Sequence, residues 1–190
     1  MKTFSEYTKS KGCNIKESVA LQYTLFPKDK DDLKRMIKDE IKKQGSSADL
    51  NHIDVSKITD FSELFKESEF NGDISKWDVS NVEQMENMFL GSDFNQDISK
   101  WDVSNVKNMD SMFSTSKFKK DISKWDVSNV KNMHAMFGNS KFNKDISKWD
   151  VSNVEDMGYM FTESKFNKDI SNWNVSNVTV MAGMFLHSKF

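Results

Sequence analysis

The stretch NQDISKWDVSNVKNMDSMFSTSKF, residues 95–118, decides the fold, because its pattern returns at a fixed interval along the chain. The five tryptophans of the chain mark the period, at positions 77, 101, 125, 149 and 173. Self-similarity at a fixed period of this length is typical of repeat proteins. The full repeats are residues 71–94, 95–118, 119–142, 143–166 and 167–190, and a degenerate copy with Ile53 at the tryptophan position occupies 47–70.

Fixed and variable positions alternate within the repeat. Most apolar positions are the same in all five full repeats, and ten of the 12 methionines and all five tryptophans occupy them. Side chains at fixed apolar positions predict a core, so we read the methionines and tryptophans as packing residues and not as a binding platform. Four positions vary freely, those of Asp110, Ser111, Ser114 and Thr115 in residues 95–118.

The spacing inside one repeat predicts two kinds of local structure. Val106, Met109 and Met112 recur every third residue, which favours a short helix or 3₁₀ turn, with Ser104 as its N-cap or Asp102 as the alternative. The segment 95–103 carries no helical stripe and reads as a short strand followed by a turn. We therefore expect an α/β repeat solenoid of parallel strands with short helical or 3₁₀ turns.

The run FNQDISKWDVSNVKNMDSMFSTSKF, residues 94–118, resembles the repeat of the BspA-like leucine-rich-repeat surface proteins, whose 24–25-residue repeats are of the mycoplasma-lipoprotein type. The resemblance covers residues 47–190. It implies a curved, leucine-rich-repeat-like solenoid and a role in binding or adhesion at a bacterial surface, and it implies no catalytic residue.

Residues 1–46 precede the repeats and predict a small α/β cap. Val19, Leu21, Tyr23 and Leu25 alternate with polar residues, which favours a strand that ends at Pro27. The segment 29–44 carries apolar residues at helical spacing, with aspartates at its start and Gly45 after its end. We expect this strand and helix to shield the first repeat, and residues 47–190 to form one array.

The opposite end carries no such cap. Residues 167–190 form a full repeat whose apolar positions are filled, so we expect their outer face to be covered by another chain, with self-association as one use, or to result from truncation of the sequence. The residues involved would be Met181, Met184, Phe185 and Phe190.

Composition argues against several classes of function. The formal charge of −2 and the single arginine, Arg35, disfavour a nucleic-acid partner. The lone Cys13 and three scattered histidines offer no zinc set, and the recurring Asp of the D-I-S motif lacks the glycine turn of a calcium loop. That column, which includes Asp73 and Asp97, is better explained by side chains that satisfy turn amides. We expect no enzymatic activity, cofactor or metal.

The chain carries no apolar segment long enough to cross a bilayer and no secretory leader in residues 1–10. These absences predict a cytoplasmic protein, whereas the resemblance favours the cell surface.

The variable positions point to the function that we expect, a non-enzymatic protein-binding module. Unlike side chains in line on a regular scaffold are how repeat proteins encode specificity. We take Tyr159 as the best anchor, because tyrosine is enriched where binding energy concentrates. The alternatives are a surface adhesin and an intracellular effector or inhibitor from a mobile element. We place Glu86, Asp110, His134 and Tyr159 in one line of recognition residues, and Asn87, Ser111 and Ala135 in the next.

Overall fold

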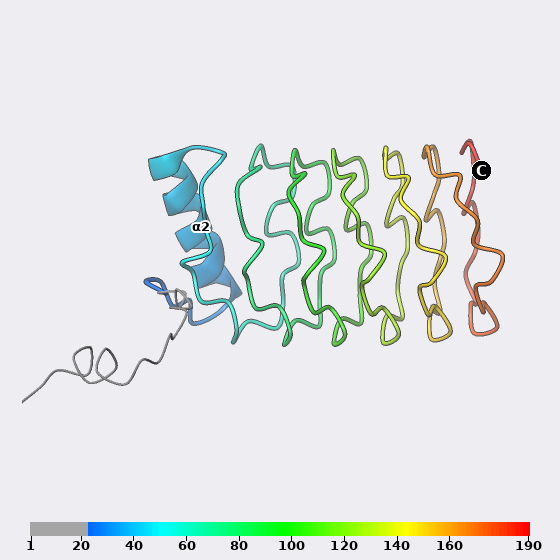
Figure 1. The fold of residues 1–190 in the computed structure, drawn as a ribbon, viewed down its shortest axis with the longest axis horizontal. Coiled ribbons are helices and arrows are strands. Elements are labelled where there is room, and N and C mark those ends of the chain that lie inside the picture. Colours follow the sequence, from blue (N-terminus) through cyan, green and yellow to red (C-terminus); the bar gives the residue numbers. More distant parts are fainter. Residues whose placement is uncertain (1–22) are drawn as a thin grey trace, which may run out of the picture.

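The computed structural model describes residues 23–190. Cys13 and most of the predicted first strand, including Val19 and Leu21, lie outside these residues. Helix α2, Lys30–Gln44, stands at one end of the molecule, and the successive turns of chain follow it side by side to the C-terminus (Figure 1). We number the repeats 1 to 6 in chain order, from residues 47–70 to residues 167–190.

The predicted α/β solenoid of parallel strands is wrong. Within residues 23–190 the structure has one helix, α2, and no strand of two or more residues. The repeats consist of turns and bends that pair through single parallel bridges, such as Gln84 with Asn108 and Asn108 with Asn132. The expected helical turn over residues 106–113 is absent as well. The expected leucine-rich-repeat-like architecture is therefore wrong too.

Overlapping β-turns prevent both a strand and a helix from forming. In repeat 3, Met112 donates its N–H to the carbonyl of Met109, Ser114 to Ser111, and Ser116 to Phe113, at 3.1–3.3 Å. The third residue of the first and last of these turns has a positive φ, 52° at Ser111 and 55° at Thr115. A left-handed residue at that place is a feature of type II turns, and it interrupts any regular helix or strand.

The other amides of the same segment pair with the next repeat. Met109, Ser111, Phe113 and Thr115 of repeat 3 donate to carbonyls of repeat 4, at 2.8–3.0 Å. Along residues 111–116, backbone amides therefore donate by turns to the neighbouring repeat and to a carbonyl of the same repeat. All four interrepeat bonds point toward the C-terminus, so repeats stack in one register.

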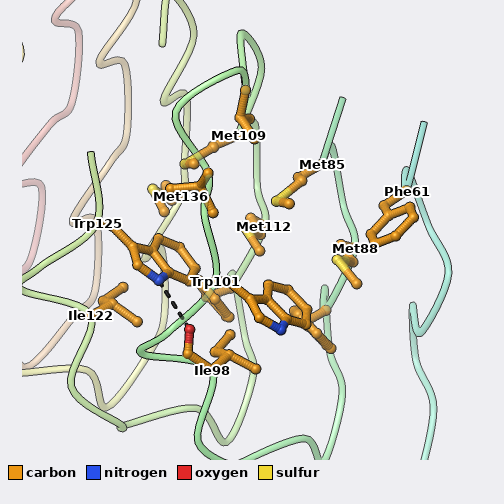
Figure 2. Packing of buried hydrophobic residues seen from close by; sticks show 14 of the residues in the cluster. Phe61, Met85, Met88, Ile98, Trp101, Met109, Met112, Ile122, Trp125 and Met136 are labelled. Carbon is orange, nitrogen blue, oxygen red and sulfur yellow. Dashed lines mark hydrogen bonds between the residues drawn. The ribbon is translucent and has the colours of Figure 1, made fainter. Parts of the chain in front are cut away.

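The core is a set of side-chain columns that run through the stack. Phe89, Phe113, Phe137 and Phe161 lie ring over ring with centroids 5.6–5.8 Å apart. The tryptophans of repeats 2 to 5 are only 4 % exposed, which confirms their predicted role in packing. Figure 2 shows the indole of Trp125 pointing at the carbonyl of Ile98 in the preceding repeat, to which its Nε1 donates at 3.1 Å.

Helix α2 lies where the sequence predicts a helix. Asp29 caps its N-terminus by accepting from the N–H of Asp32 at 2.8 Å, and Gly45, with φ of 86°, ends it. Leu33 and Ile37 are buried in the same core as the repeats. Within residues 23–29, just before α2, there is no strand, and Leu25 makes a single bridge, to Ile53. The division into a cap over 1–46 and an array over 47–190 stays a prediction.

Two Asp-x-Ser turns shape the remaining part of each repeat. In repeat 3, Asp97 accepts from the N–H of Ser99 at 2.9 Å, and Asp102 accepts from the N–H of Ser104 at 3.1 Å. Asp102, the alternative to Ser104, is thus the capping side chain, although it caps a turn and not a helix. No helix in residues 23–190 has the length and apolar character to span a bilayer.

Candidate protein-binding surface

The variable side chains of successive repeats gather along the overlapping turns. We call this surface the turn face and define it by four positions per repeat, those of Glu86, Asn87, Leu90 and Gly91 in repeat 2 and their equivalents in the other repeats. In repeats 2 to 5 most of these side chains are half-buried or exposed, while the neighbouring methionines and phenylalanines are fully buried. The turn face therefore combines a constant interior with a changing exterior.

The second and fourth positions of the turn face share an unusual backbone. At the second position φ lies between 47° and 63° in all six repeats, although the residue changes each time, from Glu63 through Ala135 and Tyr159 to Gly183. The fourth position behaves in the same way, from Glu67 to His187. The side chain at each position thus varies without a change in the path of the chain.

The structure corrects the place of Tyr159. The register of the repeats puts Gly158, not Tyr159, in line with Glu86, Asp110 and His134. Tyr159 follows Ala135 in the second line, as the matching φ values of 47° and 55° confirm. The two predicted lines are adjacent, so Tyr159 still lies beside His134.

The first part of the turn face is acidic, and hydrogen bonds within and between repeats hold its carboxylates. The Glu86 carboxylate accepts from the amide of Asn87 at 3.1 Å and from that of Asn108 in the next repeat at 3.4 Å. Asp110 accepts from the hydroxyl of Ser111 at 2.7 Å. These partners orient both carboxylates while leaving the side chains partly open to solvent.

The second part is an aromatic corner built around Tyr159. Its ring meets the His134 ring edge to face, with centroids 5.6 Å apart, and is 42 % exposed. His134 Nδ1 lies 3.4 Å from Oδ1 of Asp156. A Cβ on Gly183 would come within 2.6 Å of the tyrosine ring, so the glycine provides the space in which this ring lies. The structure brings His134 and Tyr159 together, and it leaves Glu86 and Asp110 on earlier repeats.

Sequence reasoning missed several residues of this surface. Asp156 and Asn108 precede the turn and contact the side chains of His134 and Glu86, yet they are not among the predicted residues. The third and fourth positions, such as Ser114, Thr115 and Asn139, also varied in the sequence and are part of the same face. Variation between repeats was the feature that could have identified all of them.

A surface hollow of about 390 Å³ lies between repeats 4 and 5, away from the turn face. None of the residues that line it belongs to the turn face: Asp121, Ser123, Lys124, Lys144, Asp145 and Lys148. An open row of side chains suits a macromolecular partner better than a small ligand, which usually needs a concave site.

The Asp column of the D-I-S motif serves the turns. Asp97, Asp121, Asp145 and Asp169 each accept from the N–H of the serine two residues on, at 2.9 Å. This backbone hydrogen bond is the main reason why the pKa of each of the four carboxyls lies below its ordinary value. In the described part of the chain, no three His, Cys, Asp or Glu side chains gather as metal ligands would.

The C-terminal repeat exposes side chains that the other repeats bury. Met181 is 42 % and Phe190 57 % exposed, whereas Met184 is buried and Phe185 half-buried. Of the four residues predicted to form an interface on this repeat, Met181 and Phe190 are therefore the exposed ones.

The molecule is thus a repeat protein of stacked turns with a variable face. A family model described as a Mycoplasma protein of unknown function, DUF285, matches residues 31–141 and 114–190, and the chain belongs to that family. No curated protein matches the chain. No solved structure matches it either.

Proposed function

We propose that this chain is a non-enzymatic protein-binding module that recognises its partner through the turn face. The observation that carries the proposal is the constant backbone beneath changing side chains. Six different residues occupy the second position of the turn face with φ values that span only 47° to 63°. A surface of this kind can acquire a new partner by substitution without a change in fold.

Tyr159 is the anchor of the proposed interface. It is the large aromatic side chain of the turn face, and its exposed ring is held between His134 and Gly183. A tyrosine side chain that is already held in place loses little conformational entropy on binding, and it provides a large contact area. The side chains of Asp110 and Glu86 extend the surface along the stack as an acidic line.

The partner that fits combines an apolar recess for the tyrosine ring with basic groups beside it. Glu86, Asp110 and Asp156 would meet those basic groups, and the charges would set the orientation of the partner and its rate of association more than the affinity. The resemblance to BspA-like binding and adhesion proteins supports the same class of function.

The experiment compares three versions of the chain as bait in extracts of the source cells. The turn-face variant carries Asp110→Ala, His134→Ala and Tyr159→Ala. The matched control carries Lys100→Ala, Lys124→Ala and Lys148→Ala, three exposed side chains of another column. We expect the wild type and the control to enrich the same protein at least about tenfold over the turn-face variant.

The purified partner then permits a quantitative test. Tyr159→Ala alone should weaken binding about 10- to 100-fold, since truncation of an aromatic hot spot removes about 2 kcal/mol or more. Equal capture by all three baits, or an unchanged Kd in Tyr159→Ala, would place the binding surface elsewhere.

A further inference from the structure

Two adjoining hollows on the surface of the stack are lined by lysines. One, of about 390 Å³, lies between repeats 4 and 5, and the other, of about 300 Å³, lies between repeats 3 and 4. Three side chains line both hollows, those of Asp121, Ser123 and Lys124, so the two hollows adjoin. We call the four lysines that line them the lysine row: Lys120, Lys124, Lys144 and Lys148.

The ammonium groups of the lysine row are available to a ligand. All four lysines are exposed, and within residues 23–190 none of their Nζ atoms donates a hydrogen bond or lies within 4.0 Å of a carboxylate oxygen. Two other lysines of the stack differ, since Lys107 pairs with Glu83 at 2.7 Å and Lys131 with Glu155 at 3.2 Å. The lysine row therefore has hydrogen-bond donors that this part of the chain does not use.

Aspartates with a fixed orientation lie between these lysines. Oδ1 of Asp121 accepts from the N–H of Ser123, and Oδ1 of Asp145 accepts from that of Ser147, each at 2.9 Å. These backbone hydrogen bonds are the main reason why the pKa of each carboxyl lies below its ordinary value, so both are ionised at neutral pH. Because the serine amide binds Oδ1, Oδ2 of each carboxylate is left to accept from a ligand.

The lysine row follows the period of the stack. The two lysines and the aspartate of repeat 4 have equivalents 24 residues further on, in repeat 5. The core beneath advances in a regular step, since the rings of Phe113 and Phe137 lie 5.8 Å apart and those of Phe137 and Phe161 the same distance. A linear polymer along the stack therefore meets the same set of ammonium and carboxylate groups in each of the two repeats.

Acidic polysaccharides carry groups that match both parts of this set. Their sulfates or carboxylates accept from ammonium groups, and their hydroxyls donate to carboxylates. A single-stranded nucleic acid is usually held by aromatic side chains on which its bases stack, and no aromatic side chain lines either hollow. An anionic bilayer attracts basic segments through their positive charge, and the aspartates between the lysines weaken that attraction.

We propose that the lysine row binds an acidic polysaccharide that lies along the stack. In repeats 4 and 5, the two lysines bind the sulfate or carboxylate of a sugar residue, and Oδ2 of the aspartate accepts from one of its hydroxyls. The lysine row shares no residue with the turn face. This proposal and the proposed function therefore stand or fall separately.

The probe is a heparin octasaccharide, which carries sulfates, carboxylates and hydroxyls, and calorimetry at about 0.15 M salt measures its binding. The row variant of the chain carries Lys120→Gln, Lys124→Gln, Lys144→Gln and Lys148→Gln. The matched control removes the same charge from four exposed lysines outside the row, by Lys28→Gln, Lys38→Gln, Lys42→Gln and Lys57→Gln. Circular dichroism and thermal unfolding establish that both variants are folded.

We expect saturable binding of the octasaccharide to the wild type and to the control, and binding at least about tenfold weaker to the row variant. Tyr159→Ala, which alters the turn face, should bind the octasaccharide as the wild type does.

A further variant, Asp121→Asn with Asp145→Asn, separates recognition of a sugar from attraction by charge. It keeps Oδ1 for the serine amides and removes two negative charges, so a polyphosphate chain should bind it more tightly than the wild type. The octasaccharide should bind it at least about threefold more weakly, because its hydroxyls lose their charged acceptors.

Three results would overturn the proposal. The first is no binding of the octasaccharide up to about 100 µM. The second is an equal loss of binding in the row variant and the control, because net charge alone would then govern binding. The third is tighter binding of the wild type to polyphosphate, to a thymidine oligonucleotide or to phosphatidylserine vesicles than to the octasaccharide.

Discussion

At the residue scale, the left-handed turn positions explain how the surface changes while the fold does not. Ser111, Ala135 and Tyr159 share a φ of about 50° although such a conformation strains any residue with a Cβ. The overlapping hydrogen bonds on both sides of each position hold it there. The free-energy cost of this strain is small compared with the stabilisation that the buried methionines and phenylalanines provide by packing.

The substitution Ala135→Gly tests this strain. Ala135 has φ of 47°, and glycine adopts that region freely, so we expect the free energy of unfolding to rise by about 0.5–1 kcal/mol. Urea unfolding followed by tryptophan fluorescence measures the change. Ala135→Val is the control and should destabilise, and a glycine variant less stable than the wild type would contradict the assignment of a strained backbone.

The Asp column predicts a dependence on pH. Four of its carboxyls, at positions 97, 121, 145 and 169, have folded-state pKa values below their ordinary value because serine amides donate to them. A lowered pKa adds stability that is fully present above the unfolded value of about 3.9 and is lost as the pH falls through the folded value. The free energy of unfolding should therefore fall below about pH 4.

Replacing the four aspartates at positions 97, 121, 145 and 169 by asparagine separates this effect from general acid unfolding. Asparagine keeps the acceptor oxygen and removes the titration, so the fall below about pH 4 should become shallower. The matched control changes Asp31, Asp39, Glu67 and Glu163 to their amides, four exposed carboxylates that accept no hydrogen bond within residues 23–190. Identical acid profiles for the two quadruple variants would contradict the role of the serine amides.

The residues of the candidate site were only partly predictable. The sequence marks Glu86, Asp110 and His134 as variable, and the structure places them on one line. The sequence does not reveal the contacts between repeats. Asn108 contacts Glu86, and Asp156 contacts His134, each over a separation of 22 residues. Such pairs depend on the stacking register, which one repeat read alone does not provide.

At the element scale, α2 follows from local rules and the repeats do not. Asp29 before the helix and Gly45 after it satisfy the free amides and carbonyls of a helix, and Leu33 and Ile37 form its buried face. These features lie within one element, so the sequence is sufficient to predict them.

The helix cap gives the prediction at this scale. Asp29→Ala should lower the free energy of unfolding by about 0.5–2 kcal/mol, because the amide of Asp32 loses its acceptor. Asp31→Ala is the control, as Asp31 is exposed in the first turn and caps nothing. Calorimetry of the two variants measures the difference, and an equal loss of stability in both would argue that only charge matters.

The strand prediction failed for a physical reason that the sequence contains. Ile98, Trp101 and Val103 are residues that strands favour, but an Asp-x-Ser turn begins at Asp97 and another at Asp102. Two Asx turns so close together leave no room for an extended segment. The two turns fixed by the aspartate and serine side chains therefore override the strand preference of these apolar residues.

At the scale of the whole molecule, stability comes from contacts between neighbours. Each tryptophan donates to a carbonyl of the preceding repeat, as Trp125 does to Ile98, and phenylalanines at equivalent positions stack between neighbouring repeats, as Phe113 does on Phe137. Interactions of this kind connect a repeat only with the two beside it, so an array has stable interior repeats and weaker ends. The helix α2 covers the first repeat of the described stack.

Amide hydrogen exchange of the free monomer, resolved by residue, tests the central claim most directly, namely that each repeat donates one set of amides to the next. We expect the amides of Met157, Tyr159, Phe161 and Glu163 to exchange at least about a hundredfold more slowly than those of Met181, Gly183, Phe185 and His187. Equal protection of the two sets would contradict the account.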